Sequence, residues 1–336
     1  MPFDLSLLDK SPIAKGETAS VALRRTIAYA QRAEALGYKR FWVAEHHNTH
    51  ELASASPEIL IASLAASTRS IRVGSGGVML QHYSPYKVAE NFNLLESLAP
   101  GRIDIGIGKA PGGLPLSTRA LQSGYDQARR GDFASQLREF DAYLGASNDQ
   151  RQEGLAATPT PTTSSEKFLL GASVESAALA AELGWQFVFA RHLNGDDVAL
   201  ASAVSTYRDL AQKTPIVALA VIADRDGNKA RETAAGFTPI RVTIANGQSV
   251  TVGSEEQAAE FARQAGVADY TTEKRQANVL AGNGGDIVAE IEVLADRFGI
   301  DEFILDLFNQ GDSRLDAIAL IADARDAAHT PRALSA

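Results

Sequence analysis

Apolar residues along this chain alternate between short continuous runs and positions three or four residues apart. The short runs are typical of buried strands, and they begin near eight positions: Phe3, Arg40, Ile71, Arg102, Lys167, Gln186, Pro215 and Asp301. The spaced positions predict amphipathic helices, over residues 23–36, 57–66, 85–95, 133–144, 174–183, 196–212, 287–298 and 315–328. Eight strands, nearly all followed by a helix, predict an α/β chain folded as a (β/α)8 TIM barrel.

A doubly wound parallel sheet is the alternative to the barrel. Such a sheet normally carries a glycine-rich phosphate turn directly after its first strand. This chain has Asp9-Lys-Ser-Pro-Ile13 at that place, which is not such a turn. The pattern therefore favours the barrel.

Two segments interrupt the alternation, one after strand 4 (about 111–165) and one after strand 7 (about 236–283). The first contains a polar stretch, 147–166, that predicts a surface loop. In the second, Asn246-Gly247 lies between two β-branched runs and predicts a hairpin. We expect one domain over 1–336 with these two insertions. The second insertion is expected to be a lid with hinges at Gly282, Gly284 and Gly285, the alternative being an inert insertion.

Composition narrows the classes of protein that remain. The 336 residues include no cysteine, which excludes disulfides, thiolate metal sites and a cysteine nucleophile. The net charge of −9 disfavours binding to nucleic acid or to an anionic membrane. The longest apolar run, Ile216 to Ala223, is far shorter than a membrane helix, and the N-terminus does not look like a signal peptide. We expect a cytoplasmic protein.

The active site of a TIM barrel lies at the C-terminal ends of its strands, and several reactive residue types occur there. His46, His47 and His50 follow strand 2 and His192 follows strand 6, where histidine can serve as a general base or a metal ligand. Gly76-Gly77 after strand 3 indicates a bulge or a close approach to a ligand, or else only a corner of the barrel.

Phosphate binding is predicted between strands 4 and 5. Lys109 ends strand 4, while Ser173 and Ser176 lie at the start of the helix after strand 5, where free N–H groups favour an anion. Ser173 could equally be a plain helix cap.

A metal-dependent hydrolase is a competing interpretation of the same barrel. Its ligands would come from Glu45, His46, His50, His192 and Asp306. Against it, the spacing of four residues between His46 and His50 suits a helix rather than a loop, and we expect no metal.

Several ordered segments make the chain similar to the bacterial luciferase-like monooxygenase family of flavin-dependent TIM-barrel oxidoreductases. The segments are Ala35-Leu-Gly-Tyr38, Phe41-Trp-Val-Ala-Glu-His-His47, Val73-Gly-Ser-Gly-Gly-Val-Met-Leu80, Ser84-Pro85, Ala89-Glu90, Leu94-Leu-Glu-Ser-Leu-Ala-Pro-Gly-Arg-Ile-Asp-Ile-Gly-Ile-Gly108, Leu170-Gly-Ala-Ser173 and Phe298-Gly-Ile-Asp-Glu-Phe303. Together they cover nearly the whole chain, with the two insertions least constrained.

The resemblance implies roles for particular residues. His46 would be the catalytic histidine beside the flavin, with His47 as a weaker candidate. Gly76-Gly77 would form a non-prolyl cis peptide against the flavin ring. The expected cofactor-binding set is Gly76, Gly77, Lys109, Ser173, Ser176 and His192. Lys109 replaces an arginine of luciferase, Ala172 an acidic residue and Gly108 a cysteine.

The resemblance also implies a reaction. Reduced FMN would react with O2 to give a C4a-peroxyflavin that oxygenates a small organic substrate. An F420-dependent oxidoreductase and a non-catalytic flavin-binding protein are the alternatives. No nicotinamide-binding segment is evident, so a separate flavin reductase is expected, and a homodimer is expected from the family.

Overall fold

The computed structural model describes residues 3–126, 129–145, 154–245, 247, 249–275 and 277–329. Eight parallel strands close into a barrel, because β13 pairs with both β1 and β8 and because β7 also pairs with β8. These strands are β1 (Asp4–Asp9), β2 (Arg40–Val43), β3 (Arg72–Ser75), β5 (Ile103–Gly108), β6 (Glu166–Gly171), β7 (Gln186–Ala190), β8 (Ile216–Ala223) and β13 (Glu302–Leu307). The closure confirms the TIM barrel, and the doubly wound sheet is wrong.

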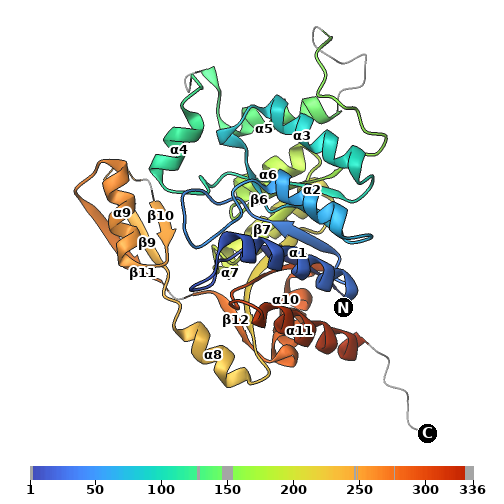
Figure 1. Ribbon diagram of the computed structural model, residues 1–336, viewed down its shortest axis with the longest axis vertical. Helices are drawn as coiled ribbons and strands as arrows, with labels where there is room; N and C mark the ends of the chain where they lie inside the picture. Colours follow the sequence, from blue (N-terminus) through green and yellow to red (C-terminus); the bar gives the residue numbers. More distant parts are fainter. Residues whose placement is uncertain are drawn as a thin grey trace.

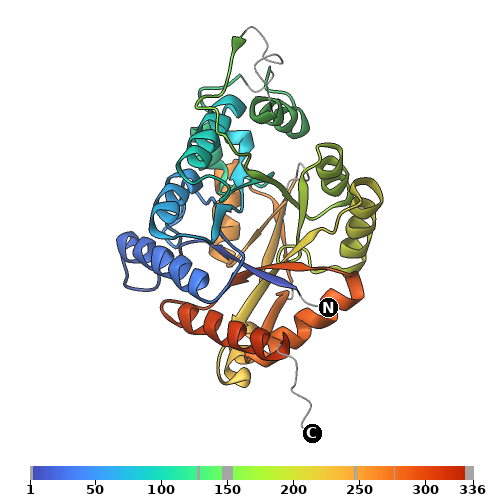
Figure 2. The ribbon, with the colours of Figure 1, turned by 90° about the vertical axis from the view of Figure 1, so that its right-hand side faces the viewer.

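Helices surround the barrel and follow the predicted positions (Figures 1 and 2). They are α1 (Ala19–Ala35), α2 (Pro57–Ser67), α3 (Pro85–Leu98), α5 (Phe133–Gly145), α6 (Val174–Glu182), α7 (Asp197–Ala211), α10 (Gly284–Phe298) and α11 (Ser313–His329). Ser84 caps α3 by accepting from the Lys87 N–H, with Pro85 in the first turn, as the sequence predicts. None of the helices in the described ranges has the length and apolar content needed to cross a membrane.

The barrel interior is filled by side chains in layers. At the N-terminal end, Arg40 donates to Glu302 (2.6 Å) and to Asp104 (3.1 Å), so one buried guanidinium joins two buried carboxylates. Above it lies an apolar layer, in which Trp42 and Phe168 meet edge to face with ring centroids 4.8 Å apart. The barrel is therefore closed at its N-terminal end, and ligands must approach from the C-terminal end.

The 236–283 segment folds against itself. The predicted hairpin is present as β9 (Ile240–Ile244) and β10 (Ser249–Val252), with antiparallel pairing. Gly247 at its turn has φ +83°, a conformation that glycine adopts without strain, while Asn246 lies outside the described residues. A third strand, β11 (Tyr270–Lys274), pairs with the other edge of β9 and was not predicted.

Three helices were also missed by the sequence pattern: α4 (Pro115–Gln122), α8 (Gly227–Ala235) and α9 (Glu255–Ala265). Phe261 of α9 packs on the β9–β11 sheet in an apolar cluster that Leu114, the N-cap residue of α4, joins. Gln264 of α9 accepts from the Leu116 N–H (2.9 Å), and its carbonyl accepts from Arg119 of α4 (2.9 Å). The two interrupting segments are thus bound to each other, on the same side of the barrel (Figure 1).

The three glycines expected as hinges lie in regular structure. Gly282 ends β12 (Val279–Gly282), a short strand paired with β8, and Gly284 and Gly285 form the first turn of α10. A Cβ on Gly284 would lie 2.1 Å from the Leu320 carbonyl oxygen of α11. Gly284 therefore has a packing role, because it lets α10 and α11 approach closely.

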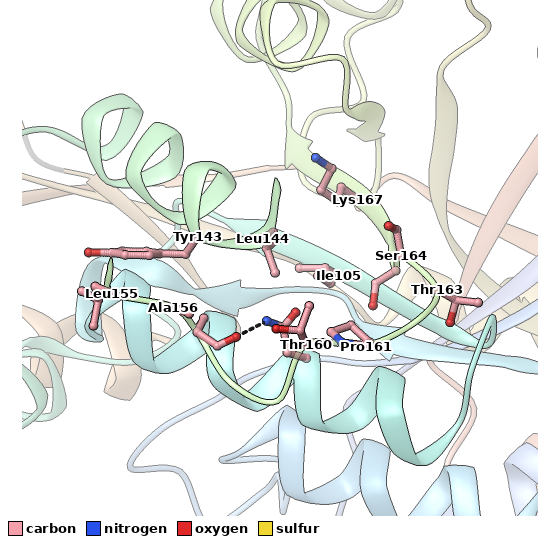
Figure 3. A pocket seen from close by; sticks show the side chains of 13 residues that line it. Ile105, Tyr143, Leu144, Leu155, Ala156, Thr160, Pro161, Thr163, Ser164 and Lys167 are labelled. Atoms are coloured by element: carbon pink, nitrogen blue, oxygen red, sulfur yellow. Dashed lines mark hydrogen bonds between the residues drawn. The ribbon is translucent and has the colours of Figure 1, made fainter. Parts of the chain in front are cut away.

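The predicted surface loop lies partly outside the described residues, which resume at residue 154. From there the loop is anchored rather than free, since the carbonyl of buried Ala157 accepts from Asn93 of α3 (2.8 Å). Figure 3 shows this hydrogen bond beside a cavity of about 150 Å³, with Tyr143 and Leu144 of α5 on one side and Lys167 of β6 on another. The cavity contains none of the predicted site residues.

Candidate active site at the C-terminal end of the barrel

The predicted site residues follow five neighbouring strands and so meet at one end of the barrel. His46 and His47 follow β2, Gly76-Gly77 follows β3, Lys109 follows β5, Ser173 follows β6 and His192 follows β7. Parallel strands place all of these positions at the same end. Within that end, the side chains separate into three groups. We call them the floor (Lys10, His46, His192 and Asp306), the network (Glu45, His47 and Tyr83) and the edge (Lys109, Ser173 and Ser176).

His46 and His192 belong to the floor. Burial is the first cause that lowers the pKa of each imidazole, to about 4 in both cases. The backbone N–H of His46 donates to the Ser54 carbonyl (2.8 Å) and that of His192 to the Ala218 carbonyl (3.1 Å), which fixes both residues. Nδ1 of His192 is buried and has no hydrogen-bond partner. Both histidines are therefore neutral at pH 7.

Lys10 and Asp306 complete the floor and form an ion pair (Nζ to Oδ2, 2.5 Å). Each follows by two residues a side chain of the apolar layer, Leu8 in β1 and Ile304 in β13. Because side chains two apart on a strand share a face, that spacing is the signal that could have located the pair. Sequence reasoning missed Lys10, and it considered Asp306 only as a metal ligand.

Glu45 organises the network beside the floor. Its buried carboxylate accepts from the Met79 N–H (2.9 Å) and from the Tyr83 hydroxyl (2.8 Å), and it lies 2.6 Å from Nε2 of His47. Burial, followed by the Glu45 charge, raises the pKa of Tyr83 well above its usual range, so Tyr83 remains a donor. His47 thus points into this network, whereas its neighbour His46 belongs to the floor.

Gly76 and Gly77 are joined by the expected cis peptide bond. A Cβ on Gly76 would lie 2.6 Å from Leu8 Cδ1, and one on Gly77 would lie 2.8 Å from the Gly106 carbonyl oxygen. Neither position has room for a larger residue, because Gly76 packs against Leu8 and Trp42 and Gly77 packs against the backbone of β5.

Lys109, Ser173 and Ser176 lie at the edge of the site. The Ser173 hydroxyl accepts from the Ser176 N–H (3.3 Å), so the cap that the sequence left open is present. Lys109 is exposed and its charge helps to lower the pKa of Glu175, after a backbone hydrogen bond and the Ser173 hydroxyl. The lysine is therefore near the start of α6, but Glu175 competes there with any bound anion.

A flavin nucleotide suits these groups. The buried, unpartnered Nδ1 of His192 can hydrogen-bond a heteroatom of the flavin ring. The start of α6 with Lys109 offers N–H groups and positive charge to a phosphate. The residues present thus match both ends of FMN.

The metal-site interpretation has little structural support. Within the described residues no group of three or more His, Asp or Glu side chains is placed to hold a metal ion. Asp306 is paired with Lys10, Glu45 is held by the network, and His50 is exposed.

Comparison with known proteins gives a consistent result. The model of the luciferase-like monooxygenase family matches residues 1–302. N-acetyl-S-alkylcysteine monooxygenase of Bacillus subtilis is 42% identical over 309 residues, which cover 90% of this chain and 91% of that protein. A luciferase-like monooxygenase of Escherichia coli is 42% identical over 205 residues, 60% of this chain and 59% of that one.

Solved structures agree on the fold. The crystal structure of apo-MsnO8 superposes with a TM-score of 0.77 at 29% identity, covering 96% of this chain and 98% of that one. A type II Baeyer-Villiger monooxygenase from a Pseudomonas putida plasmid, in complex with FMN, superposes with a TM-score of 0.67 at 18% identity. The match covers 96% of this chain and 97% of that one. At that identity the second likeness concerns the fold alone.

Proposed function

We propose that this chain, which belongs to the luciferase-like monooxygenase family, uses reduced FMN and O2 to oxygenate a small organic substrate. That the protein is an oxidoreductase of the monooxygenase type follows from the family and from its relatives. The observation that carries the finer proposal is His46, whose pKa burial lowers to about 4, at the end of the barrel that also holds Lys109 and the start of α6.

When bound, reduced FMN would supply two electrons and the activation of O2, so that one oxygen atom enters the substrate and the other leaves as water. The chain's own residues would do the rest. Gly76-Gly77 would support the flavin ring, and Lys109 with the start of α6 would hold the phosphate. Neutral His46 can accept a proton or donate its N–H at an imidazole nitrogen. Phe308 and Phe237, with ring centroids 5.4 Å apart, would limit water at the floor.

For the substrate we propose a thioether acid, because the relative that spans nine-tenths of this chain acts on an N-acetyl-S-alkylcysteine. The test supplies N-acetyl-S-methylcysteine, FMN, NADH and a separate flavin reductase under ¹⁸O2. Mass spectrometry should find one ¹⁸O in the product or in the fragment released from it. A parallel assay replaces FMN and its reductase with reduced F420. Oxygenation with FMN supports the proposal, and turnover only with F420, or with neither cofactor, contradicts it.

His46→Ala should reduce product formation about a hundredfold or more, the usual range for loss of an acid-base residue, while FMN still binds. His50→Ala is the matched control, because His50 lies in the same loop but is exposed. Equal activity of His46→Ala and wild type would remove His46 from the reaction.

The phosphate assignment has its own test. Lys109→Ala combined with Ser173→Ala should weaken FMN more than riboflavin, since only FMN carries a phosphate. Equal weakening of the two flavins, measured by fluorescence titration, would contradict the assignment.

The source of reduced flavin and the assembly are also open to test. If the purified chain with FMN oxidises NADH rapidly without a reductase, the proposal of a separate reductase is wrong. We propose a homodimer through the packed helices α2 and α3, which expose Ile59, Leu94 and Leu98. Leu98→Asp should then convert a dimer into a monomer in sedimentation experiments, and a monomeric wild type would contradict the dimer.

A further inference from the structure

The floor of the site contains one ammonium group whose hydrogen-bonding capacity is not used up. Lys10 has three N–H donors, and Asp306 is its hydrogen-bond acceptor in the structure. Its ammonium also lies 4.9 Å from the centroid of the Phe308 ring. The Lys10 side chain keeps 26% of its surface exposed, against 2% for Asp306, so a ligand can reach the cation more readily than its partner.

The other charged groups close to the floor are engaged or neutral, and Lys109 lies at the outer edge of the site, beside α6. His46 and His192 carry no charge at pH 7, and the Glu45 carboxylate is held by the Tyr83 and Met79 donors. Arg191, which starts the loop after β7, is bound by Asp197 (3.2 Å) and Asn278 (3.0 Å). Among these residues, Lys10 is the cation left available on the floor.

The two charges of the ion pair act unequally on the two histidines. At His46 the Lys10 charge lowers the pKa more than Asp306 raises it, whereas at His192 the Asp306 effect is the larger. The positive charge therefore dominates at His46, where the proposed chemistry takes place, and would attract a negative group of a ligand.

The surroundings of Lys10 also suggest what is attached to that negative group. Phe308 is half-buried against Lys10 and in contact with Phe237, so an apolar surface adjoins the cation. The chain as a whole carries a net charge of −9, which repels an anion at long range and makes a local cation necessary to bind one.

We propose that Lys10 binds a carboxylate of the substrate, so that the substrate is a small organic acid whose apolar part lies against Phe308. This inference deepens the proposed function and rests on it for the identity of the site. Lys10 would act as a binding residue that selects the acid over its uncharged analogue.

The experiment measures binding by calorimetry to the protein carrying oxidised FMN. The probes are the S-methyl, S-propyl and S-benzyl forms of N-acetylcysteine, each as the free acid and as the primary amide. We expect the wild type to bind at least one acid about tenfold or more tightly than its amide, the size expected for a charged hydrogen bond. Lys10→Gln should bring that acid to the affinity of the amide and leave the amide unchanged. Lys213→Gln is the control, because Lys213 is an exposed lysine near the N-terminal end of the barrel.

Several results would overturn the inference. One is a wild type that binds no acid more tightly than its amide. Another is an equal loss of affinity for acid and amide in Lys10→Gln. A third is a tenfold loss of affinity for FMN in Lys10→Gln while the preference for the acid is retained. The last result would assign the ammonium to the flavin. Lys10-dependent binding of the acid without oxygen transfer would refute the proposed function but support this inference, so the two failures are distinguishable.

Discussion

The two half-buried histidines of the floor should make the protein sensitive to mild acid. An imidazole in the unfolded chain titrates near 6.5, whereas the pKa of His46 and of His192 in the fold is lowered to about 4. Between these values the unfolded chain binds protons that the folded chain does not, so folding free energy is lost as the pH falls from about 6.5 towards 4. From pH 7 to pH 5 the loss works out at about 2 kcal/mol for each histidine.

Urea unfolding of the flavin-free protein at pH 7 and pH 5 measures this loss. Other groups titrate over the same range, so the informative quantity is the difference between wild type and His192→Gln, whose side chain does not titrate. Between the two pH values, the free energy of unfolding should fall by about 2 kcal/mol less in the variant than in the wild type. If both proteins lose the same free energy, the imidazole of His192 is not held neutral by burial and the argument for a neutral floor fails.

Three further substitutions test the barrel and its site, and a fourth, Gly124→Ala, is a control. Glu45→Gln should lower the free energy of unfolding by about 1–3 kcal/mol, because an amide cannot accept from all of the donors that the carboxylate now satisfies; an unchanged urea midpoint would contradict this. Arg40→Met should cost about 3 kcal/mol, because it removes one cation from Asp104 and Glu302 at the opposite end of the barrel and leaves them only Arg72 and Lys39 as cationic partners; FMN affinity measured by titration should stay the same. Gly106→Ala should cost about 3 kcal/mol or more in a thermal melt, since its Cβ would lie 2.0 Å from the Ser75 carbonyl oxygen. Gly124→Ala, where a Cβ meets nothing within 4 Å, should be nearly neutral.

Much of the fold could be predicted from local pattern alone. Barrel strands are buried on both faces, so they appear as continuous apolar runs, and their order fixes the barrel. The parts that were missed are those whose apolar residues are few or are shared with distant segments. β11 is exposed along its whole length, and Ser117 is the one buried residue of α4, so neither element shows a clear periodicity.

The candidate site also has residues that the sequence could predict and residues that it could not. The rule that strand ends carry the chemistry located His46, Gly76-Gly77 and His192. It could not separate His46 from His47, because only the fold shows that one lies on the floor and the other contacts Glu45. Lys10 was missed because the short apolar run ends before it, and its partner Asp306 lies 296 residues away in the chain.

The contacts between the two interrupting segments limit how chimeras of this protein and its relatives can be built. Leu114 completes the apolar cluster under α9, and Gln264 of α9 holds α4 through the Leu116 N–H and Arg119. A chimera that imports only one of these segments would replace half of a matched interface and leave the other half without its partner. Exchanging these segments between relatives will therefore require both to be moved together, although they are encoded in two separate stretches of the gene.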